Sequence, residues 1–344
     1  MSDVIIGWDV GGAHLKVARV DPAGAVCAVI QVPCALWRGL GELHQAMALA
    51  ASQVGQSAHH AVTMTGEMVD LFPNRNTGVI EIARFMREEL AGSSVRFYRG
   101  DRAFVASDGV ALHASEIASA NWRASVDLVA SHIAAGVFVD IGSTTTDIIA
   151  IVDGQPRFRG RDDYSRLLSG ELVYSGLVRT PLMAVLDRVV FRGEVVPIVA
   201  EHFATMADVY RVLGELPEHA DQHPSADGAE KTAFASARRI ARMIGREVES
   251  ATSNDWRVLA QSFRSAQLSR IKSALDRVAA RANLAQSVTL IGAGVGAFLV
   301  REIAHEQARS YRSFAELLRL NGPAEDTVTD VAPAVAVALL ARES

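Results

Sequence analysis

Residues 140–147 read Asp-Ile-Gly-Ser-Thr-Thr-Thr-Asp, and residues 9–16 read Asp-Val-Gly-Gly-Ala-His-Leu-Lys. Each stretch joins two short apolar runs that are typical of strands, so each is predicted to contain a tight turn. Placing Asp9 over Asp140 also aligns the strands that follow, at an offset of 140 − 9 = 131 residues. That offset is a domain length, not the period of a solenoid. We therefore predict a duplicated chain whose two lobes face each other across a cleft.

The hydrophobic pattern around the turns predicts an α/β fold. In the first half, strands are expected at 4–8, 15–20, 25–32, 61–65 and 95–98, with helices around 36–50, 79–90 and 108–134. In the second half, strands are expected at 137–142, 147–152, 157–158 and 288–291, with helices at 201–213, 229–250, 255–282, from 297 and from 333. The predicted division is a lobe at 1–134 and a lobe at 135–344, the second with a helical insertion at about 200–285.

Composition narrows the class of protein. The chain has 344 residues, 49% hydrophobic, and a formal net charge of 34 − 39 = −5. High apolar content excludes a disordered chain, and the lack of a continuous basic stripe argues against nucleic acid as a partner. The N-terminus lacks a signal-peptide pattern, and no apolar run approaches the roughly 18 residues that span a bilayer. With only Cys27 and Cys34, we expect no disulfide framework and a cytoplasmic location.

The two turns carry residue types that suit a phosphate and its metal ion. Backbone N–H groups at glycines, together with hydroxyls, bind phosphate oxygens, and carboxylates bind Mg²⁺. The candidate phosphate-binding residues are Gly11, Gly12, Gly142, Ser143, Thr144 and Thr145. Lys16 is placed to neutralise phosphate charge, and Asp9 and Asp147 are the candidate metal ligands. An ordinary hairpin explains either turn alone, but two equivalent turns favour a shared phosphate site.

A third glycine-rich segment follows the strand expected at 288–291 and opens a helix. Gly292, Gly294 and Gly296 have the spacing G-x-G-x-G, which is not the dinucleotide-binding fingerprint. The helix N-terminus and the exposed glycine backbone favour a site for a nucleotide or another flat polar group. Close packing of the helix on the strand explains the same glycines equally well.

These three segments, in this order, resemble the two phosphate motifs and the adenosine motif of the superfamily of actin, sugar kinases and the heat-shock seventy chaperones. More narrowly, residues 65–73, 170–181 and 201–210 resemble the hydantoinase A/oxoprolinase family. Within it they are most similar to the branch of methanofuran or methylofuran biosynthesis in tetrahydromethanopterin-linked one-carbon metabolism. The resemblance implies two ribonuclease-H-like (actin-like ATPase) lobes with mixed sheets around a central cleft.

The resemblance also implies a transferase. Members of that branch join an aminomethyl-furanmethanol diphosphate to the phenol of glutamyl-tyramine or glutamyl-tyrosine, which forms an aryl ether and releases diphosphate. We expect Mg²⁺ to be needed and ATP not to be required, with Lys16 assisting the leaving group. The base that accepts the phenol proton is either Asp140 or Glu67, although Glu67 is equally explained as a capping or solvated acid.

Two other functions fit the same fold. One is an ATP-dependent kinase or hydantoinase-like hydrolase that uses the same cleft, and the other is a non-catalytic nucleotide-binding assembly protein. Both predict nucleotide binding at the third glycine segment, whereas the transferase predicts only small-molecule substrates. The oligomeric state stays open.

Several further polar side chains have less specific interpretations. Arginines that suit carboxylate or phosphate are Arg75, Arg179, Arg239 and Arg242, of which the last two are expected to be solvated. His14 is expected to contact phosphate or to cap the hairpin. Tyr174 suits stacking on a furan or phenol ring, but a half-buried core residue is the favoured interpretation. An ordinary polar loop beside a helix is the expected setting of His202, Asp208, Asp221, His223 and Asp227, because their spacing matches no zinc site.

Overall fold

A computed structural model describes residues 3–320 and 325–344 of the chain. The first sheet has the strand order β3-β2-β1-β4-β5-β6. Its strands are β1 (Ile5–Val10), β2 (His14–Val20), β3 (Val26–Pro33), β4 (His59–Met64), β5 (Ser94–Gly100) and β6 (Ala103–Ala106). Strand β1 is antiparallel to β2 and parallel to β4, so the sheet is mixed.

The second sheet repeats this arrangement with the order β10-β8-β7-β13-β14, and β9 also pairs with β8. Its strands are β7 (Ala135–Ile141), β8 (Thr146–Val152), β9 (Gln155–Arg157), β10 (Leu172–Val173), β13 (Leu290–Ala293) and β14 (Tyr311–Ser313). Strand β7 is antiparallel to β8 and parallel to β13, as β1 is to β2 and β4. The predicted duplication and the two ribonuclease-H-like lobes with mixed sheets are confirmed.

Twelve α-helices accompany the sheets within the described residues. They are α1 (Leu40–Val54), α2 (Arg75–Glu89), α3 (Ala114–Ile117), α4 (Asn121–Ala130), α5 (Asp163–Ser169), α6 (Met206–Leu213), α7 (Ala233–Arg242), α8 (Ser253–Arg281), α9 (Ala297–Glu306), α10 (Phe314–Leu318), α11 (Glu325–Asp330) and α12 (Ala332–Glu343). None of them is both long enough and apolar enough to cross a membrane.

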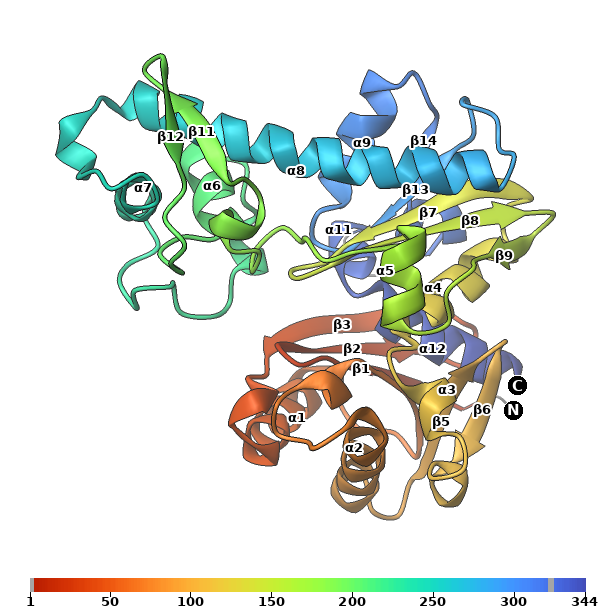
Figure 1. The fold of residues 1–344 in the computed structure, drawn as a ribbon. Helices are drawn as coiled ribbons and strands as arrows, with labels where there is room; N and C mark the ends of the chain where they lie inside the picture. The colour runs from red at the N-terminus through yellow and green to blue at the C-terminus, as the bar shows by residue number, and fades with distance from the viewer. Residues whose placement is uncertain (1–2, 321–324) are drawn as a thin grey trace.

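Helices α4 and α12 lie between the two sheets (Figure 1). The C-terminal helix α12 packs on β1, β2 and β4 of the first sheet and on α4. Side chains from both sheets join it in one apolar core, for example Ile5, Phe138 and Ile149. Alternate residues on the same strands, such as Trp8 and Val139, enter the outer cores, because side chains along a strand alternate between its faces.

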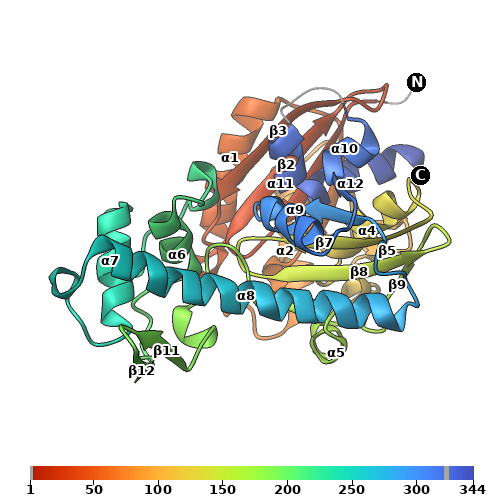
Figure 2. The ribbon, with the colours of Figure 1, turned by 90° about the horizontal axis from the view of Figure 1, so that it is seen from above.

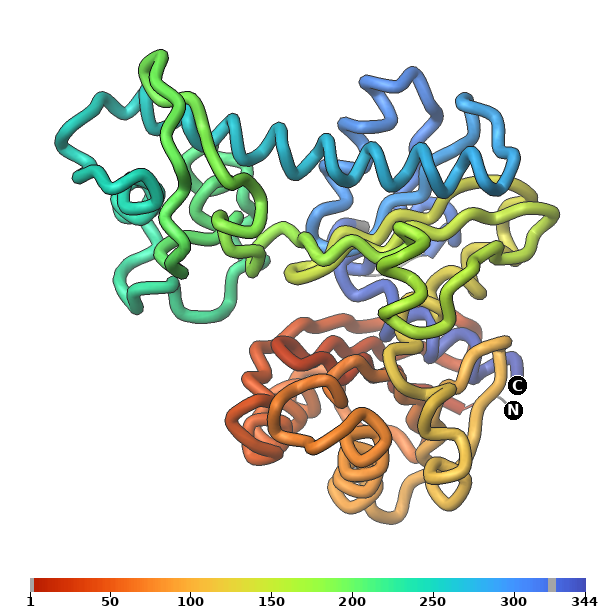
Figure 3. Tube along the Cα trace, viewed as in Figure 1, coloured from red at the N-terminus to blue at the C-terminus, as the bar shows by residue number. Residues whose placement is uncertain are grey.

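The outer faces of the sheets are covered by separate helices. Helices α1 and α2 contribute to the core under the first sheet, and α8 and α9 cover the second. Figure 2 shows α8 running along the second lobe and beyond it. The helical insertion predicted at about 200–285 contains α6, α7 and α8. At its far end α8 packs on α6 and α7 and on a hairpin of β11 (Arg188–Phe191) and β12 (Glu194–Pro197), which precedes the predicted insertion. We call α6, α7, the loop between them and this hairpin the insertion. The insertion projects from one end of the second lobe (Figure 3).

Several short elements were not predicted from the sequence. They are β6, α5, β10, the β11–β12 hairpin, β14, α10 and α11. The helices predicted at about 108–134 are α3 and α4, separated by a turn in which Ser119 has a positive φ of 51°. Elements of two to seven residues span too few periods for a hydrophobic pattern to identify them.

Candidate active site

A cleft of about 680 Å³ lies between the sheets, and the two predicted turns line it from opposite lobes. The turns have the same geometry. Gly11 N donates to His14 O over 3.0 Å, and Gly142 N donates to Thr145 O over 2.9 Å. All six candidate phosphate-binding residues line the cleft, namely Gly11, Gly12, Gly142, Ser143, Thr144 and Thr145.

Two buried carboxylates lie at the ends of equivalent strands. Asp9 on β1 is the cross-strand partner of Lys16 on β2, and Asp140 on β7 is the cross-strand partner of Asp147 on β8. Burial raises the pKa of Asp9 to about 6, although Lys16 opposes the shift. Burial also raises the pKa of Asp140 to about 7, again against Lys16 and with a contribution from the neighbouring Asp147 and Asp9 charges. At neutral pH a carboxyl with such a pKa can both accept and release a proton.

Asp147 differs from the other two acids because it already has a cationic partner. Arg166 on α5 donates from Nη2 to Asp147 Oδ1 over 2.5 Å, and its side chain is 2% exposed. The guanidinium also lies 4.1 Å from the ring centroid of Trp122. Burial raises the pKa of Asp147 while Arg166 lowers it. No sequence pattern indicates Arg166, because α5 is too short to be recognised from its hydrophobic periodicity.

The fit of a magnesium ion can be judged from these acids. Asp9 Oδ1 is buried without a hydrogen-bond partner, whereas Asp147 Oδ1 accepts from Arg166. No cluster of three or more His, Cys, Asp or Glu side chains suited to a metal occurs in residues 3–320 and 325–344. Mg²⁺ in proteins is commonly held by one or two carboxylates, with water and substrate phosphate completing its shell. Asp9 therefore fits such an ion, while Asp147 has a competing partner.

The chain after β10 braces the second turn. The N–H groups of Val178 and Arg179 donate to Ser143 O over 3.1 and 2.8 Å, and Leu177 N donates to Gly142 O over 2.9 Å. This contact is close enough to require a glycine. A Cβ at Gly176 would lie 2.5 Å from the backbone nitrogen of Thr144. The same segment carries Arg179 into the cleft.

Glu67, the second base candidate, is near the cleft but does not line it. Its side chain is 1% exposed, and Oε1 accepts a hydrogen bond from Ser119 Oγ over 2.8 Å. Burial raises its pKa, and the hydrogen bond from Ser119 lowers it. Of the two candidates, Asp140 is the one that faces the cleft.

The third glycine segment does not line the cleft. Gly294 has a φ of +76°, and a Cβ there would lie 2.2 Å from Asp140 Oδ1. A Cβ at Gly296 would meet Ile141, and one at Gly292 would meet the Tyr311 ring. These contacts support the packing explanation, in which the glycines let α9 and its loop approach the end of β7.

One end of the cleft is aromatic. Trp37 and Tyr174 line it with 39% and 56% of their surfaces exposed, so the expectation of a half-buried core Tyr174 is wrong. The Arg179 guanidinium lies 5.1 Å from the Trp37 ring centroid and so joins the two lobes. His14 is 6% exposed, and burial holds its pKa well below the usual range. Its Nδ1 is 3.5 Å from Ser143 Oγ, also across the cleft.

A loop of the insertion reaches this end of the cleft. His223 Nε2 lies 2.6 Å from the carbonyl oxygen of Ala13, and its ring centroid is 4.9 Å from that of His14. Gln222 Nε2 donates to Gln31 O on β3 over 3.0 Å. The insertion therefore contacts the first lobe directly beside the first turn.

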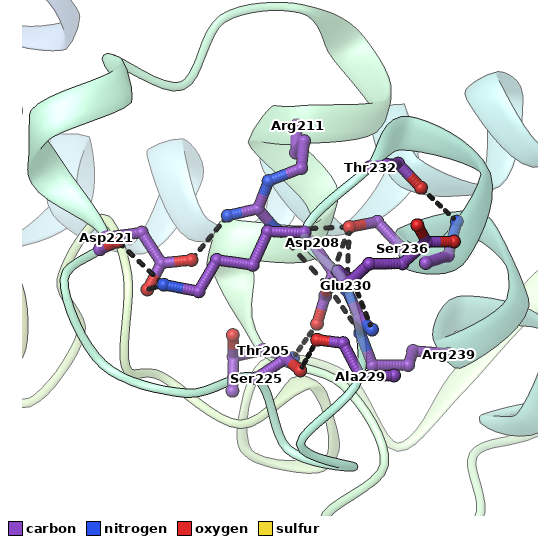
Figure 4. Close-up of polar contacts among 12 residues, drawn as sticks. Thr205, Asp208, Arg211, Asp221, Ser225, Ala229, Glu230, Thr232, Ser236 and Arg239 are labelled. Atoms are coloured by element: carbon purple, nitrogen blue, oxygen red, sulfur yellow. Dashed lines mark hydrogen bonds and ion pairs between the residues drawn. The ribbon is translucent and has the colours of Figure 1, made fainter.

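Buried ion pairs hold that loop (Figure 4). Arg239 on α7 donates to Asp208 over 2.8 Å and to Asp227 over 3.0 Å. Its side chain is 0% exposed, so the expectation that Arg239 is solvated is wrong, whereas Arg242 is 40% exposed. Arg211 pairs with Asp221 in the same network. The acids of this polar loop thus have basic partners.

At the other end of the cleft, Arg75 at the start of α2 pairs with Asp163 at the start of α5. Arg75 had been a candidate for binding a substrate carboxylate or phosphate. Its ion pair with Asp163 links the first lobe to the second. Of the four arginines predicted to suit a carboxylate or phosphate, Arg179 is the one that lines the cleft.

Comparison with known proteins identifies relatives across most of the chain. Residues 59–312 match the family model described as hydantoinase/oxoprolinase. A (4-{4-[2-(gamma-L-glutamylamino)ethyl]phenoxymethyl}furan-2-yl)methanamine synthase from Methanocaldococcus jannaschii is 28% identical over 86% of this chain and 87% of its own. A synthase of the same name from Methanococcus vannielii is 35% identical over 31% of this chain and 48% of its own.

Among solved structures, a nucleotide-free acetone carboxylase is similar with a TM-score of 0.52 and 11% identity. The match covers 87% of this chain and 66% of that one. At such low identity the similarity shows a shared fold and not a shared activity.

Proposed function

Because the chain belongs to the hydantoinase/oxoprolinase family, and its curated relatives are enzymes named as synthases, we propose that it is a transferase that makes an aryl ether. The proposed substrates are an aminomethyl-furanmethanol diphosphate and the phenol of a γ-glutamyl-tyramine or γ-glutamyl-tyrosine. Their condensation yields the phenoxymethyl-furan linkage that the relatives' name contains. The products are the ether and diphosphate.

One observation carries the proposal. Lys16 and the two phosphate turns share one cleft with Asp140, a carboxyl whose pKa is raised to about 7. The first group of residues suits a diphosphate leaving group, and the carboxylate suits a proton acceptor. Both requirements of an ether-forming displacement therefore occur in a single site.

The bond changes follow from this placement. The C–O bond between the furan methylene and the diphosphate breaks, and the diphosphate leaves with the bonding electrons. The phenol oxygen forms the new C–O bond to the methylene carbon and gives its proton to Asp140. Since a phenol has a pKa of about 10, the base makes attack feasible at neutral pH.

We assign the leaving group to the turns. Backbone N–H groups at Gly11, Gly12 and Gly142, and the hydroxyls of Ser143, Thr144 and Thr145, would bind the phosphate oxygens, as the sequence predicted. Lys16 would neutralise charge as it develops on the diphosphate. These residues, which come from both lobes, would hold the leaving group between the two turns.

Magnesium fits the site through Asp9, whose Oδ1 has no other partner. When bound, the ion would supply further positive charge to the diphosphate. Asp147 would join it only as far as its ion pair with Arg166 allows.

The first experiment measures diphosphate release with Mg²⁺ from the furan diphosphate, with and without γ-glutamyl-tyramine, and separately with ATP alone. The proposal predicts release that depends on the phenolic acceptor and does not need ATP. Consumption of ATP, with no acceptor-dependent diphosphate, would instead identify a kinase or a hydrolase.

A further inference from the structure

We propose that the aromatic end of the cleft, formed by Trp37, Tyr174 and Arg179, is the acceptor subsite. Arg179 would pair with the carboxylate of the acceptor, while the acceptor's ring lies along Trp37 and Tyr174. This inference rests on the proposed function, because it assigns one of the two substrates to a place in the cleft. It also predicts which acceptors the enzyme prefers.

The Arg179 guanidinium differs from the other cations of the cleft in its electrostatic partners. Three cationic side chains line the cleft, Lys16, Arg166 and Arg179. Arg166 forms an ion pair with Asp147, and Lys16 interacts with the charges of Asp9, Asp140 and Asp147. Arg179 forms no ion pair with any carboxylate in the described part of the chain. Burial lowers its pKa, opposed only by the Tyr174 phenol, so an incoming carboxylate would restore the interactions that burial removes.

Arg179 is also held in a fixed position. Its backbone N–H donates to Ser143 O in the second turn, and its guanidinium lies over the ring of Trp37 from the first lobe. An arginine held in this way loses little side-chain freedom when it binds. Because its planar fork matches a carboxylate in two hydrogen bonds, it would select for that group.

Two aromatic side chains beside Arg179, Trp37 and Tyr174, line the same part of the cleft. Trp37 and Tyr174 are both exposed to the cleft, although large aromatic side chains are usually buried. Trp37 is also fixed from behind, since its ring centroid is 5.6 Å from that of His223. His223 in turn is held by Ala13 and by the insertion loop. The network in Figure 4 therefore supports a wall of the cleft.

The acceptor matches this arrangement chemically. A γ-glutamyl-tyramine has a phenol at one end, a flat ring beside it and a carboxylate at the other end. The phenol must reach Asp140, and the acidic floor around Asp9 and Asp140 repels a second carboxylate. The end of the cleft formed by Trp37, Tyr174 and Arg179 accommodates the other two features of the acceptor, its flat ring and its carboxylate.

The test compares two acceptors, γ-glutamyl-tyramine and its analogue in which the α-carboxylate is a carboxamide. Acceptor-dependent diphosphate release is measured for the wild type, Arg179→Gln, Arg179→Lys and, as a control, Arg188→Gln on the exposed hairpin. We expect the wild type to prefer the carboxylate on the order of 10- to 100-fold in kcat/KM, the range of a charge-assisted hydrogen bond. Arg179→Gln should lose most of that preference through a higher acceptor KM, Arg179→Lys should keep part of it, and Arg188→Gln should keep all of it.

Two results would overturn the subsite while leaving the transferase intact. One is an unchanged preference in Arg179→Gln, and the other is a rise confined to the KM of the furan diphosphate, which would place Arg179 on the phosphates. Thermal melting of each variant verifies folding.

A binding measurement separates failure of the subsite from failure of the proposed function. Quenching of tryptophan fluorescence by the acceptor alone should occur in the wild type, weaken in Arg179→Gln and be reduced in Trp37→Phe. If no acceptor supports diphosphate release, the proposed function is wrong and this measurement decides the subsite. Quenching that depends on Arg179 and Trp37 would support it, and a lack of binding would overturn it.

Discussion

Arg166 donates a hydrogen bond to Asp147 over 2.5 Å, at the position of the second lobe that corresponds to Lys16 in the first. The two lobes therefore differ in charge where their folds agree. In the first lobe this position supplies a cation to the cleft, and in the second it supplies a carboxylate that an arginine neutralises. The duplicated fold thus forms an asymmetric cleft, in which Lys16 lines the first lobe's side and Asp147 on the second lobe's side is paired with Arg166.

The substitution Lys16→Ala should abolish most of the turnover. We expect a loss of about 10²- to 10³-fold in kcat, because the charge acts on the leaving group as it develops. Steady-state diphosphate release measures the effect. Lys272→Ala, on the exposed side of α8, is the matched control and should be close to the wild type. Near-normal turnover in Lys16→Ala would remove the diphosphate from this part of the cleft.

The Arg166–Asp147 pair should matter for stability as well as for activity. Arg166→Met leaves the Asp147 carboxylate buried without its partner, which typically costs about 3 to 5 kcal/mol. In the double variant Arg166→Met with Asp147→Asn the uncompensated charge is removed, so part of the loss should be recovered. Urea unfolding of the two single variants and the double variant measures the coupling. Additive losses would show that the pair is not coupled.

Two isosteric substitutions distinguish the base candidates. Asp140→Asn should lower kcat by about 10²- to 10⁴-fold, the usual contribution of a positioned base. Glu67→Gln should change kcat by only a few-fold, because its side chain does not line the cleft and Gln can still accept the hydrogen bond from Ser119. Both variants retain the shape of the native side chain. The opposite order of effects would assign the base to Glu67.

The parts of the site that could be predicted are local. Each turn lies between two strands that pair with each other, so the residues Asp9 to Lys16 and Asp140 to Asp147 contain both the fold signal and the candidate site residues. The offset of 131 residues followed from that pattern, and the equivalent hydrogen bonds at Gly11 and Gly142 agree with it.

The parts that were missed depend on distant segments. Arg166, Trp37 and Asn121 reach the cleft from three separate places in the chain, and nothing in their own neighbourhoods indicates a ligand site. A helix rich in arginine predicts that Arg239 is solvated. The structure instead buries it, because Asp208, 31 residues earlier in the chain, pairs with it in the interior. From the sequence alone, the glycines in and after β13 fit both a ligand site and close packing. The structure favours packing, because Ile141 lies directly beside Gly296.

Protonation of His60 should weaken the fold below neutral pH. The His60 ring is buried on β4, where Nδ1 accepts a hydrogen bond from Trp8 Nε1 over 3.1 Å and Nε2 lies 3.0 Å from Ser57 O. A proton on Nδ1 would face the Trp8 donor and lose that bond. Burial lowers the pKa of His60 to about 4, assisted by His59 and opposed by the Ser57 carbonyl.

The sign of the effect follows from this lowered pKa. Between the folded pKa of about 4 and the ordinary value of 6.5, the unfolded chain binds the proton and the folded chain does not. The free energy of unfolding therefore falls as the pH drops below 6.5, by about 2 kcal/mol at pH 5 from this group alone. His60→Gln offers an acceptor and a donor but does not titrate. Urea unfolding at pH 7.5 and pH 5 should give a loss for the wild type that exceeds the loss for His60→Gln by about that amount, and equal losses would show that His60 is not the titrating group.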